Sequence, residues 1–239
     1  MSPRGEGLFD LELPPTVEAV VRKVEAIAGQ PIAAQKVKGS LLGPCVGYFE
    51  DKSGTPVIEA SGKPALEDVV LEVLRLALRG GRREQDMPYG ELRHERNRAL
   101  CARLYRIVEE EWLLPEAEAH GVAVRRHLTQ RFDAELIEAL GAGKYRKGEE
   151  EVLRTRLAAL DGLELAVAAV DPATARWQVQ RVGELDRTAA RSMGFMLSVI
   201  DRYRPFESVE QMTAAYYVAV PFLFDTAANS AAPAGRKRR

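Results

Sequence analysis

One amphipathic segment, Leu66 to Arg79, limits the folds open to this chain more than any other stretch. Successive residues of a helix are about 100° apart, so its apolar side chains fall on one arc and its charged side chains form a narrow stripe opposite. We therefore expect a helix with one face on a core and the other lining a cleft or meeting solvent. The apolar arc is Leu66, Val69, Val70, Val73, Leu74 and Ala77, and the charged stripe is Asp68, Glu72, Arg75 and Arg79.

A helix and a small sheet are predicted before this segment. Pro14 and Pro15 begin a helix that runs to about Ala28, because valines recur at helical spacing and Gly29 follows. Three short runs with strand character come next, and a glycine-containing turn joins the last two as in a β-hairpin. We expect a small antiparallel three-stranded sheet. Its strands are residues 32–37, 45–50 and 55–60.

The rest of the chain is predicted to be mostly helical. Pro115 closes the first of these helices or begins a new turn, and Asp171-Pro172 and Arg204-Pro205 separate later ones. Gly141 to Gly143 is the best internal boundary. The fold class is therefore α+β, with an N-terminal domain at 1–140, a helical region at 144–228 and a disordered basic tail at 229–239. The predicted helices span about 90–114, 121–140, 148–170, 183–203 and 208–227.

Composition excludes several classes of protein. The 34 basic and 35 acidic side chains nearly cancel, so net charge indicates no particular partner. The N-terminus lacks the apolar core of a secretory signal, and no stretch approaches the roughly 20 apolar residues of a membrane span. We expect a cytoplasmic protein without membrane contact. Cys45 and Cys101 are too far apart in sequence for a redox or thiolate zinc motif, and we expect both to be buried.

Five positions of the amphipathic segment correspond to a zinc-binding motif. Zinc hydrolases carry His-Glu-x-x-His on a helix, because residues four apart share a face and both imidazoles can reach one metal. Residues 71–75 here read Leu-Glu-Val-Leu-Arg. Glu72 occupies the general-base position, whereas Leu71 and Arg75 occupy the two ligand positions.

The order of elements resembles that of the ImmA/IrrE-like zincin metallopeptidases from about Leu11 to Glu135, including the hairpin at 47–59. In that family a downstream helix supplies the third zinc ligand, and the segment 105–115 is similar to it. The resemblance implies a zincin-like fold with Glu109 or Glu110 at the third ligand or its supporting carboxylate. It also implies bacterial regulation, because many members cleave a repressor.

No histidine of the chain restores a metal site by its spacing. His120 and His127 would lie about 10.5 Å apart along a helix axis, whereas zinc ligands lie about 2 Å from the metal. His94 is followed four residues later by Arg98, which is no ligand. Losing the metal-bound water removes an activation on the order of 12 kcal/mol. A lone Glu72 would return only roughly 3 to 5 kcal/mol. We therefore predict no zinc-dependent proteolysis.

A simpler interpretation treats these charges as ordinary helix surface. Glu72 and Arg75 would then be an exposed pair worth a few tenths of a kcal/mol. The run Glu109 to Glu111 would be a solvated helix face, with Arg106 able to pair with Glu110.

Together with the zincin resemblance, the sequence predicts a non-catalytic, zincin-like module without a cofactor that binds a protein or peptide through the former cleft, or serves only as a scaffold. The predicted cleft residues are Asp68, Glu72, Arg75, Arg79 and Glu109. One alternative is an active hydrolase that holds a divalent metal such as Mn²⁺ or Mg²⁺ through carboxylates, with Asp68, Glu72, Glu109 and Glu110 as donors. Another is nucleic-acid binding through the basic residues Arg236, Lys237, Arg238 and Arg239.

Overall fold

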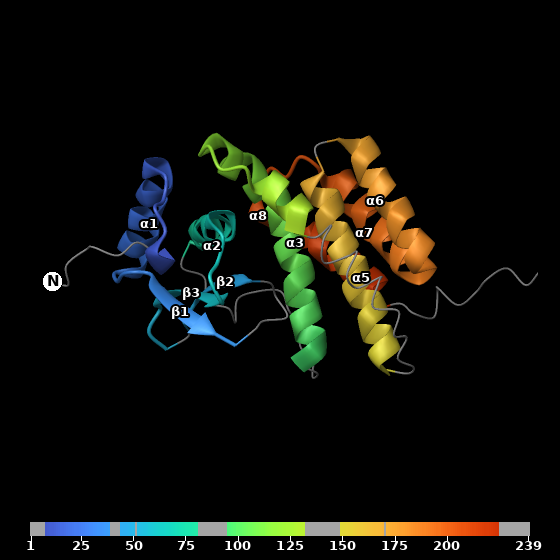
Figure 1. The fold of residues 1–239 in the computed structure, drawn as a ribbon, viewed down its shortest axis with the longest axis horizontal. Helices are drawn as coiled ribbons and strands as arrows, with labels where there is room; N and C mark the ends of the chain where they lie inside the picture. The colour runs from blue at the N-terminus through green and yellow to red at the C-terminus, as the bar shows by residue number, and fades with distance from the viewer. Residues whose placement is uncertain are drawn as a thin grey trace, which may run out of the picture. The chain divides into compact units, whose positions relative to one another are not determined.

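The chain forms two compact units, unit 1 over residues 1–127 and unit 2 over residues 128–239 (Figure 1). The computed structural model describes residues 8–38, 44–50, 52–80, 95–131, 149–169 and 171–224. The division falls between residues 127 and 128, within the helical stretch 124–131. The predicted boundary at 141–143 lies outside the described residues. The mostly helical α+β class is confirmed.

The described part of unit 1 contains a small sheet and three long helices, with a short helical turn at Leu8–Asp10 before them. Gly29 and Gly80 end the first two helices in the left-handed region, with φ of 72° and 57°, where glycine is favoured. The third helix continues through Pro115, so the prediction that this proline closes it is wrong. The elements are α1 Pro15–Ala28, β1 Ala33–Val37, β2 Cys45–Phe49, β3 Pro56–Ser61, α2 Leu66–Arg79 and α3 Glu95–Ala119.

The sheet has the strand order β1-β3-β2. β2 and β3 form the predicted antiparallel hairpin. β1 runs parallel to β3, with Ala33 opposite Val57 and Val37 opposite Ser61, so the expectation of an all-antiparallel sheet is wrong. Because the hairpin occupies one edge of β3, the other edge is the one left for β1. The sheet is therefore mixed, and β1 and β2 are its two edge strands.

The core of unit 1 lies between the sheet and the helices α1 and α2. Ile58 and Ala60 of β3 are fully buried, as are Val69 and Val73 of α2. Figure 1 shows α1 and α2 on the same side of the sheet, and the two helices contact each other. The apolar face predicted for α2 is confirmed as core.

Unit 2 is built from α5 Glu149–Ala168, α6 Pro172–Leu185, α7 Arg187–Tyr203 and α8 Val209–Phe224. The sequence prediction missed most of α6, because Asp171-Pro172 was interpreted only as a separator. Asp171 instead caps α6, accepting hydrogen bonds from the amides of Ala173 and Thr174 at 2.8 and 2.9 Å, and Pro172 is its first residue. None of the helices within the described ranges is both long and apolar enough to cross a membrane.

Candidate functional site

The charged stripe of α2 is buried. Asp68, Glu72, Arg75 and Arg79 are 7%, 2%, 0% and 8% exposed. The expectation that this stripe lines a cleft or meets solvent is therefore wrong. Its side chains are covered because α3 and the edge strand β2 contact α2 on that side.

Arg75 is the centre of the buried polar contacts. Its Nε donates to Oε2 of Glu109 at 2.8 Å, and its Nη2 lies 3.2 Å from Oε1 of Glu110. Its Nη1 donates to Oε1 of Glu72, one turn earlier on the same helix. Nη2 also contacts the backbone oxygen of Arg106 at 3.4 Å. One fully buried guanidinium therefore engages three carboxylates.

Two further arginines complete the arrangement. Arg106 of α3 donates from both Nη atoms to the carboxylate of Glu72, with the Nη1 contact at 3.1 Å. Arg79 donates to both oxygens of Glu109, from Nε at 3.1 Å and from Nη2 at 2.9 Å. Such two-point contacts are the strong form of an arginine–carboxylate interaction.

These side chains form a charge network, a name we use for Glu72, Arg75, Arg79, Arg106, Glu109 and Glu110. Its three arginines and three glutamates give a net charge of zero. Glu109 and Glu110 are 0% and 4% exposed, so the interpretation of this run as a solvated helix face is wrong for both. The Glu72–Arg75 contact is likewise a buried pair and not a surface one.

The charge network also closes the outer edge of β2. Oε2 of Glu72 accepts a hydrogen bond from the amide of Gly47 at 2.6 Å, and Nη1 of Arg79 donates to the carbonyl of Gly47 at 3.1 Å. Nη2 of Arg106 donates to the carbonyl of Cys45 at 3.1 Å. A Cβ at Gly47 would lie 3.1 Å from Oε2 and 3.2 Å from Cβ of Glu72. Glycine at this position therefore permits the close approach of α2 to the strand.

The electrostatics keep the central groups ionised. Burial alone would raise the pKa of Glu72, but the charges of Arg106 and Arg75, with hydrogen bonds from Arg106 and Gly47, lower it from 4.5 to about 2. Burial would lower the pKa of Arg75, but the carboxylates of Glu72, Glu109 and Glu110 outweigh burial and raise it. Glu72 is a carboxylate and Arg75 a guanidinium at any physiological pH.

The residues at this site do not fit a zinc ion. The carboxylates of Glu72, Glu109 and Glu110 converge on the guanidinium of Arg75, which is itself a fixed positive charge. Placing a divalent cation beside that charge is unfavourable. Among the residues that the structure describes, no group of three histidine, cysteine or acidic side chains could hold a metal.

Asp68 is the remaining predicted carboxylate donor. Asp68 contacts His127, with Oδ2 of Asp68 and Nε2 of His127 3.2 Å apart, and Glu67 lies 3.9 Å from Nδ1 of the same imidazole. Cys45 and Cys101 are buried, as predicted. His94 and the tail residues Arg236 to Arg239 lie outside the described residues.

Of the five predicted cleft residues, the structure thus brings together Glu72, Arg75, Arg79 and Glu109, and Glu110 joins them. Sequence reasoning missed Gly47 and the role of Arg106. A usable signal for Arg106 was present: α2 carries Glu-Arg-Arg at 72, 75 and 79, and α3 carries Arg-Glu-Glu at 106, 109 and 110. Two helical faces with such complementary charges can neutralise each other.

Comparison of the chain with protein-family models, with curated proteins and with solved structures finds no match.

Proposed function

We propose that this chain is a non-catalytic, zincin-like protein, a pseudopeptidase that acts as a regulatory protein- or peptide-binding module in a bacterial cytoplasm. The observation that carries the proposal is the fully buried Arg75, whose guanidinium holds the carboxylates of Glu72, Glu109 and Glu110 at a position where the motif comparison expects a zinc ligand. In this proposal the guanidinium of Arg75, which is always charged, takes the place of the metal as the cation.

The state of Glu72 also argues against hydrolysis. A general base works best when its pKa lies near the working pH, whereas the pKa of Glu72 is lowered to about 2. Both of its oxygens already accept hydrogen bonds, from Arg75, Arg106 and Gly47. The carboxylate is thus a structural acceptor with little basicity left for activating a water.

The same contacts disfavour the alternative of a metal held by carboxylates. The three buried arginines neutralise the three buried glutamates, so binding a divalent cation would leave two excess positive charges in a low-dielectric interior. Such a site would have to eject at least one arginine. We therefore propose that the protein needs no metal.

Metal analysis tests this proposal. The full chain and its Leu71→His/Arg75→His variant, which restores both motif histidines, are purified, incubated with Zn²⁺ and dialysed, and their zinc content is measured by mass spectrometry. The unaltered chain should retain no stoichiometric zinc and show no EDTA-sensitive hydrolysis of casein. Stoichiometric zinc in the unaltered chain, lost on Glu72→Gln or Glu109→Gln, would overturn the proposal.

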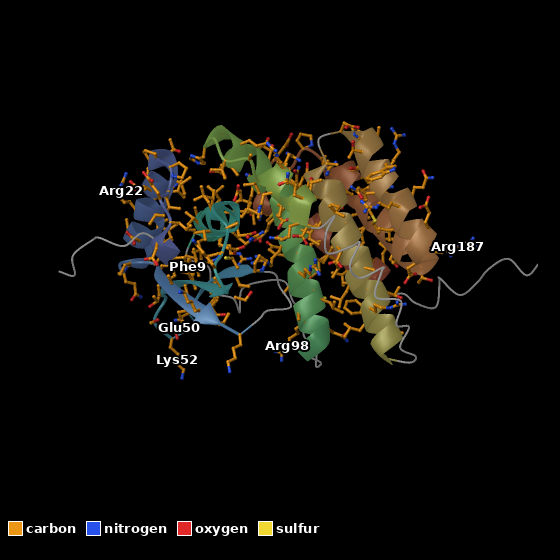
Figure 2. All side chains as sticks on the ribbon, in the orientation of Figure 1. Phe9, Arg22, Glu50, Lys52, Arg98 and Arg187 are labelled. Atoms are coloured by element: carbon orange, nitrogen blue, oxygen red, sulfur yellow. The ribbon has the colours of Figure 1, made fainter. Side chains whose placement is uncertain are left out.

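Arg22→Met is a matched control for the arginine substitutions. Arg22 lies on the outer side of α1, its side chain is 58% exposed, and its contact is an ion pair with Glu18 at 3.6 Å (Figure 2). Its zinc content should equal that of the unaltered chain. Zinc gained by this variant would show that the assay detects nonspecific metal.

A further inference from the structure

The two edge strands of the sheet differ in how their outer edges are covered. The outer edge of β2 is occupied by side chains of the charge network. β1 pairs with β3 on one side, and its central residues Ala34, Gln35 and Lys36 are exposed. In the described part of the chain, β3 is the sole strand paired with β1. Figure 1 shows β1 at the rim of unit 1, away from α2.

An uncovered edge strand is a template for one more strand. Alternate backbone amides and carbonyls of β1 face β3, and the others point outward. An extended peptide can satisfy these outward groups by forming a new ladder, which is a common mode of peptide recognition. β2 offers no such template, because Glu72, Arg79 and Arg106 already bond its outer backbone groups.

The charge of the outer edge of β1 indicates which kind of peptide could pair with it. Lys36 within β1 and Lys38 immediately after it are both exposed, and they are the charged residues of the segment 33–38. A second copy of β1 would bring like charges together, because lysines on an edge strand oppose pairing between copies. A strand rich in glutamate or aspartate would instead gain two favourable contacts.

We propose that the outer edge of β1 binds an extended acidic peptide segment of a partner protein by strand addition. This proposal rests on the proposed function, since it names the surface and the ligand chemistry of a peptide-binding module. It places the peptide on the edge of the sheet opposite the charge network. The former cleft between α2 and β2 is then a structural core and not the docking surface.

The test uses the full chain and a fluorescein-labelled peptide that alternates glutamate and valine, with fluorescence anisotropy as the readout. The peptide should bind, and the Lys36→Glu/Lys38→Glu variant should weaken it about tenfold or more, which corresponds to about 1.4 kcal/mol. Replacing the valines with proline should abolish binding, because a peptide with proline at every second position is held near the polyproline II conformation and cannot form a regular β ladder. The Lys23→Glu substitution on α1 is the matched charge control and should leave affinity unchanged.

Hydrogen exchange locates the bound peptide. Amides of β1 should become protected on binding, while those of β2 keep the protection they have in the free protein. Absence of binding, equal affinity for the double variant, or undiminished binding of the proline peptide would each overturn the proposal. None of these outcomes changes the result of the metal analysis. Failure of the docking proposal can therefore be distinguished from failure of the proposed function.

Discussion

Units 1 and 2 are both helix-rich, yet the side chains that their helices bring into contact differ in chemistry. In unit 1, the interface of α2 with α3 is a network of six buried charges. In unit 2, the contacts between α5, α6 and α7 are mostly apolar and tight: a Cβ at Gly162 would lie 2.7 Å from both Met193 and Val182. The helix contacts of unit 1 thus include a buried set of paired charges beside an apolar core, whereas those of unit 2 rely on the filling of volume.

This difference concerns specificity as much as stability. Burying charged groups costs several kcal/mol per ion, and their mutual attraction offsets that cost only when every partner is present. The charge network is therefore weak evidence for a very stable unit 1. It does fix the register of α2 against α3, because sliding either helix would leave a carboxylate or a guanidinium unpaired.

The largest effect is expected from Arg75→Met. Removing this guanidinium leaves three buried carboxylates without their shared partner, which should lower the free energy of unfolding of unit 1 by about 3–5 kcal/mol. Urea unfolding followed through the fluorescence of Trp112, in a Trp177→Phe background, reports on unit 1. The Arg22→Met control should cost less than about 1 kcal/mol. Equal losses from the two substitutions would contradict the role of the charge network.

The next effect is a loss of stability in acid that is larger in unit 1 than in unit 2. Because the folded-state pKa of Glu72 is lowered from 4.5 to about 2, its contribution is full above pH 4.5 and is lost as the pH falls toward 2. The shift corresponds to about 3 kcal/mol. Amide exchange measured across this range, and divided at each pH by the intrinsic exchange rate, should show a larger loss of protection for α2 than for α7. In Glu72→Gln this part of the pH dependence should disappear; if it persists, other groups cause it.

In unit 2, Gly162→Ala should be destabilising through overpacking, although alanine gains about 1 kcal/mol over glycine in helix propensity. The new methyl group meets Sδ of Met193 and Cγ2 of Val182 at 2.7 Å, so both must move, at a cost of about 1–3 kcal/mol. Denaturation followed by exchange of the α5 amides measures this loss, which should not change between pH 7 and 4. The double variant Gly162→Ala/Val182→Ala should recover part of it. Full stability of the single variant would mean that α5 can shift freely.

A smaller effect is expected at the start of α7. The Asp186 carboxylate accepts hydrogen bonds from the amides of Thr188 and Ala189, both at 2.9 Å, and from the hydroxyl of Thr155 at 2.8 Å. Asp186→Ala should cost about 1–2 kcal/mol, and Asp186→Asn less, because asparagine also caps helices. Thermal unfolding of the three proteins gives this ranking. The reverse order of the two variants would argue against capping.

Elements whose structure depends on neighbouring residues in the chain could be predicted from the sequence. The bounds of α2, Leu66–Arg79, follow from its own periodicity and from Gly80. The hairpin follows from a turn between two short runs. In contrast, the parallel direction of β1 was not predicted, because its short sequence specifies neither the strand it pairs with nor the direction of pairing.

The sequence predicted most residues of the candidate site but not their burial. Residues 72, 75, 79 and 109 are predicted from the charged stripe, the motif and the resemblance, and the structure brings them together. Their burial could not be read from α2 alone, because the partners of Arg75 and Glu72 stand over 30 residues away on α3. The helix α6 was missed for a different reason: Asp-Pro was treated as a break although it is also a start signal.

The neutrality of the charge network has a consequence for how this sequence can change. Any one of its six side chains, if replaced alone, leaves an uncompensated charge in the interior. We therefore expect single substitutions there to be selected against, and exchanges that remove an arginine and a glutamate together to be tolerated. In related chains these positions should covary between α2 and α3 and keep equal numbers of opposite charges, even where the surrounding core has drifted.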